Sequence, residues 1–201
     1  MLRPLALLAL GLGLALAACA QRTAPAAPAS GRGTLTPMPA TPTTDLAPFP
    51  YSVEQLRAGC STGRVLRYRL VDSGHAIETE MRFVASTEES ATIETSIKDE
   101  KGTLLGAPKR DTTKWADLMH HASFPAATTS IEAAEVDTPA GHFAASKYVV
   151  RRPSEDGRPS VAIFYFDKAK GGPPVRMLVE VAGAIAQEMT MLGDTREGAA
   201  P

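Results

Sequence analysis

Between residues 65 and 98, apolar and polar side chains alternate with a period of two. The apolar residues share one side of each segment: Leu66, Tyr68, Leu70, Ile77, Met81, Phe83, Ile93 and Ile97. This period is typical of β-strands with one buried face and one solvated face. The pattern therefore predicts three strands joined by short hairpin turns, over residues 65–71, 76–85 and 91–98.

Two other segments have helical patterns. Ser52 and Gln55 have the spacing of a capping box, which predicts a short helix ending near Gly59. Between Thr112 and Ala122, apolar residues recur at the i, i+3, i+4 and i+7 positions of one helix face. These residues are Trp115, Leu118, Met119 and Ala122. We expect this second helix to lay its Trp against the sheet.

Further strand-like segments follow this helix. They cover residues 128–136, 143–151, 161–167, 175–182 and 185–192. The segment 161–166 is apolar on both sides, which predicts a central strand covered on both faces. About eight strands in mainly sequential order with one packed helix predict a mainly β (α+β) fold. Its form would be a curved antiparallel sheet or incomplete barrel around the helix.

A different pattern opens the chain. Residues 5–18 form an uncharged run of about fourteen Leu, Ala and Gly residues after Arg3, whereas a membrane span needs roughly twenty apolar residues. Residues 1–18 therefore have the layout of a secretory signal peptide. The run ends in Leu-Ala-Ala-Cys at residues 16–19, which resembles the lipobox of bacterial lipoproteins.

In that family the Cys thiol receives a diacylglycerol, the preceding segment is removed, and the new amino terminus is usually acylated too. Two or more acyl chains anchor a protein stably to a membrane. The resemblance therefore implies lipidation of Cys19, a membrane partner through the lipid anchor, and a cell-envelope location. Ala20 favours the outer membrane under the sorting rule of enteric bacteria. The alternative is a secreted protein cut near Ala18 or Ala20, in which Cys19 is incidental.

Composition divides the rest of the chain. Residues 19–50 are rich in Pro, Ala and Thr, and such a stretch predicts an extended linker. Residues 51–193 carry the strand and helix patterns and predict one β-rich globular domain, followed by a flexible tail over 194–201. The formal net charge of −1 gives no basic excess for a phosphate backbone, so we expect no nucleic-acid partner.

Few residues suggest chemistry. If Cys19 is acylated, Cys60 has no disulfide partner, and we favour a buried thiol over a redox role. His120 and His121 are adjacent on the predicted helix and point about 100° apart, so they do not converge on one metal ion. The sequence has no Gly-x-Ser-x-Gly, His-Glu-x-x-His, P-loop or dinucleotide motif. It therefore predicts no catalytic residue, metal or cofactor.

Two motifs within residues 128–192 resemble those of uncharacterised bacterial envelope proteins. Residues 137–143 read Asp-Thr-Pro-Ala-Gly-His-Phe before a Lys-Tyr-Val at 147–149, and residues 172–176 read Gly-Pro-Pro-Val-Arg. Several such proteins are similar to the LolA/LolB-like lipoprotein-carrier half-barrels. The aromatic strand at 164–166 lacks the Trp usual in that pattern. The resemblance implies a half-barrel and transfers no ligand residue.

Methionine and phenylalanine side chains gather on the predicted inward faces: Met81, Phe83, Phe164, Phe166, Met177, Met189 and Met191. Methionine fills irregular apolar space and suits adaptable binding surfaces. In a half-barrel these side chains could line a lipid-sized cavity, and ordinary core packing is the alternative. We therefore expect a non-enzymatic, lipid-anchored envelope domain that binds an apolar ligand or lipid. The alternatives are a protein-interaction module and a hydrolase with a loop-built site.

Overall fold

The computed structural model describes residues 45–154 and 156–197. The predicted signal peptide, Cys19 and most of the predicted linker lie outside the described residues. The helical elements are α1 (Val53–Gly59), α2 (Trp115–His120) and the 3-10 turn η1 (Ala126–Thr128). The strands are β1 (Arg64–Asp72), β2 (His75–Ser86), β3 (Ser90–Lys98), β4 (Lys109–Lys114), β5 (Thr129–Thr138), β6 (Gly141–Pro153), β7 (Pro159–Asp167), β8 (Arg176–Val181) and β9 (Ala184–Arg196).

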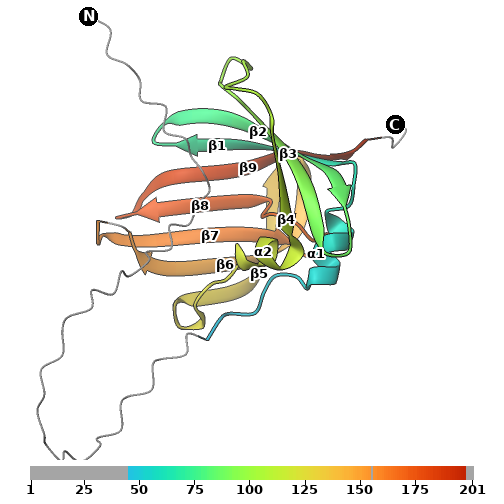
Figure 1. The fold of residues 1–201 in the computed structure, drawn as a ribbon. Coiled ribbons are helices and arrows are strands. Elements are labelled where there is room, and N and C mark those ends of the chain that lie inside the picture. The colour runs from blue at the N-terminus through green and yellow to red at the C-terminus, as the bar shows by residue number, and fades with distance from the viewer. Residues whose placement is uncertain (1–44, 155, 198–201) are drawn as a thin grey trace, which may run out of the picture. The chain divides into compact units, whose positions relative to one another are not determined.

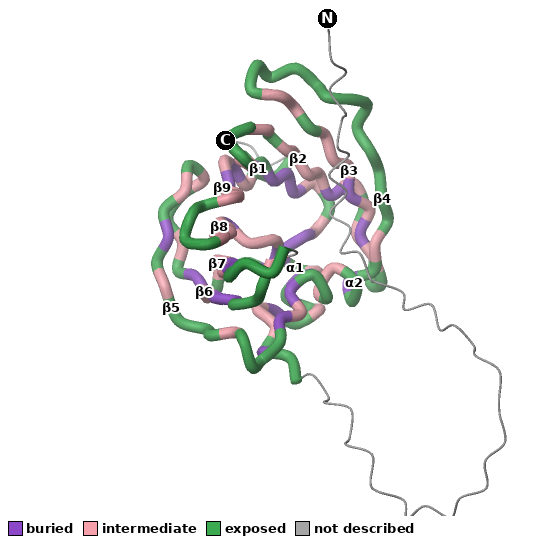
Figure 2. The backbone as a smooth tube through the Cα atoms, turned by 90° about the vertical axis from the view of Figure 1, so that its left-hand side faces the viewer, coloured by how far each residue is buried: buried purple, intermediate pink, exposed green. Residues whose placement is uncertain are grey.

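All nine strands form one antiparallel sheet in the order β4-β3-β2-β1-β9-β8-β7-β6-β5. The first and last strands of the chain pair with each other inside the sheet, and β4 and β5 form its two edges. The sheet bends around α1 and α2 without closing into a barrel (Figures 1 and 2). The predicted fold class, a curved antiparallel sheet or incomplete barrel with a packed helix, is confirmed.

Strand β4 replaces the start of the second predicted helix. Thr112 lies opposite Thr92 of β3, and their hydroxyl oxygens are 2.8 Å apart. Thr is β-branched and favours the extended backbone of a strand. The chain therefore stays extended through Lys114, and α2 begins at Trp115 without a side-chain cap.

Both ends of the described chain are packed further than the sequence pattern indicated. Ala47, in the last part of the predicted linker, is buried and donates its N–H to Phe124 O at 2.8 Å. At the other end, β9 continues to Arg196, whose Nη2 donates to Ser61 Oγ at 2.6 Å. The chain packs at Ala47 because the stretch Leu46–Phe49 is apolar. At the other end, the hydrogen bond between Arg196 and Ser61 holds the last residues of β9.

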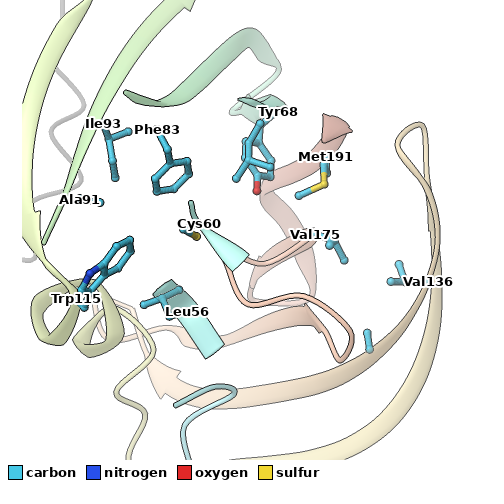
Figure 3. Packing of buried hydrophobic residues seen from close by; sticks show 12 residues of the cluster. Leu56, Cys60, Tyr68, Phe83, Ala91, Ile93, Trp115, Val136, Val175 and Met191 are labelled. Carbon is cyan, nitrogen blue, oxygen red and sulfur yellow. The ribbon is translucent and has the colours of Figure 1, made fainter. Parts of the chain in front are cut away.

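The face of the sheet that packs against the helices, here called the inner face, carries the larger of two core clusters (Figure 3). Leu66, Tyr68, Phe83 and Met191 from the sheet pack in this cluster with Leu56 of α1 and Trp115 of α2. The Trp115 side chain is 1% exposed, and its Nε1 donates to Thr87 O at 3.0 Å.

A second cluster covers the inner face of β6 and β7. It joins Tyr148, Ala162 and Phe166 of these strands to residues from the segments before α1 and after α2: Ala47, Tyr51, Ala122 and Phe124. Because these layers cover one face, Val161 and Ile163 on the other face of β7 stay partly exposed. The prediction that this strand is covered on both sides therefore holds for its inner face only.

No helix among the described residues is long and apolar enough to cross a membrane.

Candidate functional site

The inner face carries an unbroken row of apolar side chains that crosses neighbouring strands. The register pairs Ile77 with Leu70, Leu70 with Met189, Met189 with Met177, and Met177 with Phe164. Directly opposed residues on adjacent strands point to the same face of a sheet. These five residues are called the inner row: Ile77, Leu70, Met189, Met177 and Phe164. All five are partly exposed.

The inner row lies where the packed clusters end. Met189 packs against the larger cluster, and Phe164 packs against the second. The Phe164 ring centroid is 4.8 Å from that of Phe124 and 6.2 Å from that of Phe166. Residues of the row therefore pack against the two core clusters and are also partly accessible to solvent.

The structure places the seven sequence-predicted lining residues on the inner face but divides them by depth. Phe83, Phe166 and Met191 are 1%, 5% and 1% exposed and belong to the packed core. The other four are partly exposed: Met81, Phe164, Met177 and Met189. The row also contains Leu70 and Ile77. The sequence pattern placed these two residues on the apolar side of their strands, but they were not among the predicted lining residues.

Two hollows in the described part of the chain lie away from the inner row. The larger, of about 420 Å³, is lined by residues 127–130 and Arg151. The smaller, of about 70 Å³, is bordered by Arg67, Glu78, Lys98 and their neighbours on β2 and β3. Neither hollow is lined by a residue of the row.

The most buried charged group in the described chain is Arg64, at 4% exposed. Its Nε and Nη2 donate to the two carboxylate oxygens of Asp194 at 2.9 and 3.0 Å. Its Nη1 donates to Gly171 O at 2.7 Å and Gly59 O at 3.1 Å. A Cβ on Gly59 would overlap the carbonyl oxygen of Gly171. Arg64 thus fastens the end of α1 and the loop before β8 to the sheet.

Cys60 lies beside this arginine and is 1% exposed, as the sequence predicted for a buried thiol. Its Sγ is 3.7 Å from Gly171 O and 3.6 Å from Arg64 Nη1. Burial raises the pKa of the Cys60 thiol, and the nearby guanidinium offsets only part of the rise. A protonated thiol is a poor nucleophile, and the Cys60 side chain is packed in the larger core cluster.

The histidines lie at the surface. His120 and His121 are exposed, and His120 Nδ1 is 3.2 Å from Ser123 Oγ. His142 is 2.8 Å from Asp137 and 3.1 Å from Glu135, and the hydrogen bond with Asp137 is the main reason that its pKa is raised. Within residues 45–154 and 156–197, no group of three or more His, Cys, Asp or Glu residues is placed to hold a metal ion.

No protein-family model matches the chain, and no curated protein matches it. Among solved structures, the complex of Pseudomonas aeruginosa MucA and MucB contains a chain with a TM-score of 0.47 and 12% identity, over 74% of this chain and 56% of that chain. A crystal structure of MucB gives a TM-score of 0.43 and 13% identity, over 74% and 58%. The chain thus spans just over half the length of these neighbours.

Proposed function

We propose that this protein is a lipid-anchored envelope protein whose domain binds a long apolar chain, such as the acyl chain of a lipid, along the inner row. The observation that carries the proposal is the continuity of the row, from Ile77 on β2 to Phe164 on β7. No charged or hydrogen-bonding side chain interrupts it. Such a strip suits a ligand that is itself long and apolar.

The dimensions of the row fit an extended chain. Five adjacent strands give four steps of about 4.8 Å each, so the row is about 19 Å long. Each methylene that leaves water contributes about 0.8 kcal/mol. Association itself costs at least about 4 kcal/mol, so several methylenes are needed before binding is measurable. We therefore expect the affinity of the protein for fatty acids to rise with the length of the acyl chain.

Methionine at the centre of the row supports tolerance for different chains. Met177 and Met189 face each other across β8 and β9, and both are partly exposed. The thioether is flexible and polarisable, so a pair of methionines can adjust to ligands of different shape. At one end of the row, the rings of the buried residues Phe124 and Phe166 pack against Phe164 and limit its movement.

A titration of the purified full chain with a fluorescent polyene fatty acid tests this proposal. The double variant Met177→Gln, Met189→Gln keeps side-chain size but adds two amides to the row. We expect it to weaken binding about tenfold, the equivalent of about two buried methylenes. Leu178→Gln is the matched control, because Leu178 lies next to Met177 on the opposite face. Equal binding by all three proteins, or no binding by any, would contradict the proposal.

The anchor is a separate part of the proposal and rests on the Leu-Ala-Ala-Cys motif ending at Cys19. Growth with an alkyne-labelled fatty acid would attach the label to the wild-type protein. Cys19→Ser should remove the label and release the protein from the membrane fraction. Cys60→Ser, which changes the other cysteine, should leave both unchanged. Label retained in Cys19→Ser would refute lipidation at this residue.

A further inference from the structure

The two edges of the sheet differ in how well they are protected. β4 has six residues, three of which are Lys or Arg, and it runs directly into α2. Short length and basic side chains are the usual means of preventing a new strand from pairing with an edge. β5 has ten residues without Lys, Arg or Pro, and its register with β6 is continuous. β5 is therefore the less protected edge.

The first half of β5 is also accessible from both faces. Ser130, Ile131, Glu132 and Ala133 are all exposed, and Ile131 is 41% exposed. Within the described residues, β5 has β6 as its hydrogen-bonded neighbour, so its outer edge presents backbone N–H and C=O groups that can accept another strand. Val136, further along, is buried in the larger core cluster. The open part of the edge is thus residues 129–135.

Charge along this edge excludes one occupant and favours another. Glu132 pairs with Lys147 at 2.7 Å, yet its side chain is 60% exposed, and that of Glu135 is 63% exposed. Two copies of residues 129–135 paired with each other would gather four carboxylates on one short ladder, which is unfavourable. A strand that carries Lys or Arg would instead meet opposite charges.

The start of β5 has the opposite charge. The hollow of about 420 Å³ lies here, lined by Ala127, Thr128, Thr129, Ser130 and Arg151. Arg151 is exposed, and its Nη1 is 3.5 Å from Ser130 Oγ. A guanidinium beside an open hollow suits a carboxylate, which it can bind with paired hydrogen bonds.

We propose that an extended segment of a partner protein adds to the sheet antiparallel to β5, with basic side chains beside Glu132 and Glu135 and its C-terminal end in the Arg151 hollow. The antiparallel direction follows from the charges, because it brings the end of the guest strand to the start of β5. This surface is separate from the inner row and does not depend on lipid binding.

The probe for this proposal is a short fluorescent peptide of alternating Thr and Val, with two lysines in its first half and a free C-terminal carboxylate. Two further versions carry N-methyl groups on alternate amides, one on the odd and one on the even positions. Strand pairing uses only one set of guest amides. One version should therefore lose at least about tenfold in affinity for the full chain, while the other binds like the parent.

Hydrogen exchange locates the peptide. Amides of β5 should exchange more slowly with the peptide bound, and those of β4 should not change. Arg151→Ala should weaken binding of the parent peptide about threefold, because a charged hydrogen bond to its C-terminal carboxylate is lost. It should not change the binding of a version whose C-terminus is amidated. Lys109→Ala, on the opposite edge, is the matched control and should bind like the wild type.

Three outcomes would overturn the proposal: no binding up to the solubility limit of the peptide, equal loss with both N-methylated versions, or protection of residues outside β5. Sedimentation of the protein alone provides one more test. A dimer that protects β5 would assign this edge to a second copy of the chain and would also overturn it.

Discussion

The Arg64 guanidinium and the Asp194 carboxylate form two parallel hydrogen bonds, of 2.9 and 3.0 Å, between β1 and β9, which are neighbours at the centre of the sheet. The two side chains are 5% and 13% exposed. Lys170 also donates to Asp194, at 2.7 Å. The sheet therefore contains, at its centre, an ion pair that joins segments from opposite ends of the domain.

Removing one partner of this pair should be costly. Asp194→Ala leaves Arg64 charged and buried without its counter-ion, and such a change lowers the free energy of unfolding by about 3–5 kcal/mol. Urea denaturation followed by circular dichroism measures the loss. Asp156→Ala, which breaks the exposed pair with Arg158, is the matched control and should cost less than about 1 kcal/mol. Similar losses of unfolding free energy in the two variants would show that the buried pair contributes no more to stability than an exposed one.

The same carboxylate should make stability depend on acid pH. Burial alone would raise the pKa of Asp194, but hydrogen bonds from Arg64 and Lys170 outweigh it, and the pKa lies below its ordinary value. A carboxyl with a lowered pKa in the folded state stabilises the protein above its unfolded pKa of about 3.9, and this contribution is lost as the pH falls through the folded value.

Denaturation midpoints measured from neutral pH down to about pH 2 test this dependence, because the range spans the unfolded pKa of Asp. The denaturation midpoint of the wild type should fall steadily below about pH 4. Asp194→Asn should have a lower midpoint at neutral pH, and its midpoint should change less as the pH falls. Parallel profiles for the two proteins would rule out Asp194 as a source of the acid sensitivity.

Two buried tyrosines should respond in opposite ways to loss of the hydroxyl. Tyr68 is 2% exposed, and its Oη has no hydrogen-bond partner among the described residues. Tyr148 is also 2% exposed, but its Oη donates to Pro48 O at 2.9 Å. Tyr68→Phe should therefore be neutral or stabilising, whereas Tyr148→Phe should lower the free energy of unfolding by about 1 kcal/mol. Thermal unfolding distinguishes them, and a larger loss for Tyr68→Phe would point to a bound water on its hydroxyl.

The sequence predicted the strands well because their alternation is strong and their turns are marked. The turn at Ser73 and Gly74, for example, has φ values of 50° and 83°, which suit the short hairpin expected there. β4 was missed, because its residues 112–114 were assigned to the start of the second predicted helix and its pairing with β3 is a tertiary contact. Eight of the nine observed strands match predicted segments.

The candidate site was less predictable. Alternation assigned Met81, Phe164, Met177 and Met189 to an inward face, but it contains no information on what covers them. The cluster against which Phe164 packs includes Ala47 and Tyr51, from a stretch that composition assigned largely to the linker. The row also depends on the pairing of β1 with β9, which places Leu70 beside Met189 although the two are far apart in the chain. The resemblance to lipoprotein-carrier half-barrels stays a prediction.

Methyl NMR of the full chain with labelled methionine is the most direct test of the inner row as a binding surface. On addition of palmitate, the methyl resonances of Met177 and Met189 should shift together and saturate. Met119 on α2 packs against the larger core cluster and is not part of the row, so its resonance should stay in place. Saturable shifts confined to the row are the predicted result. Unchanged row resonances at saturating palmitate, or shifts at Met119 alone, would contradict the account.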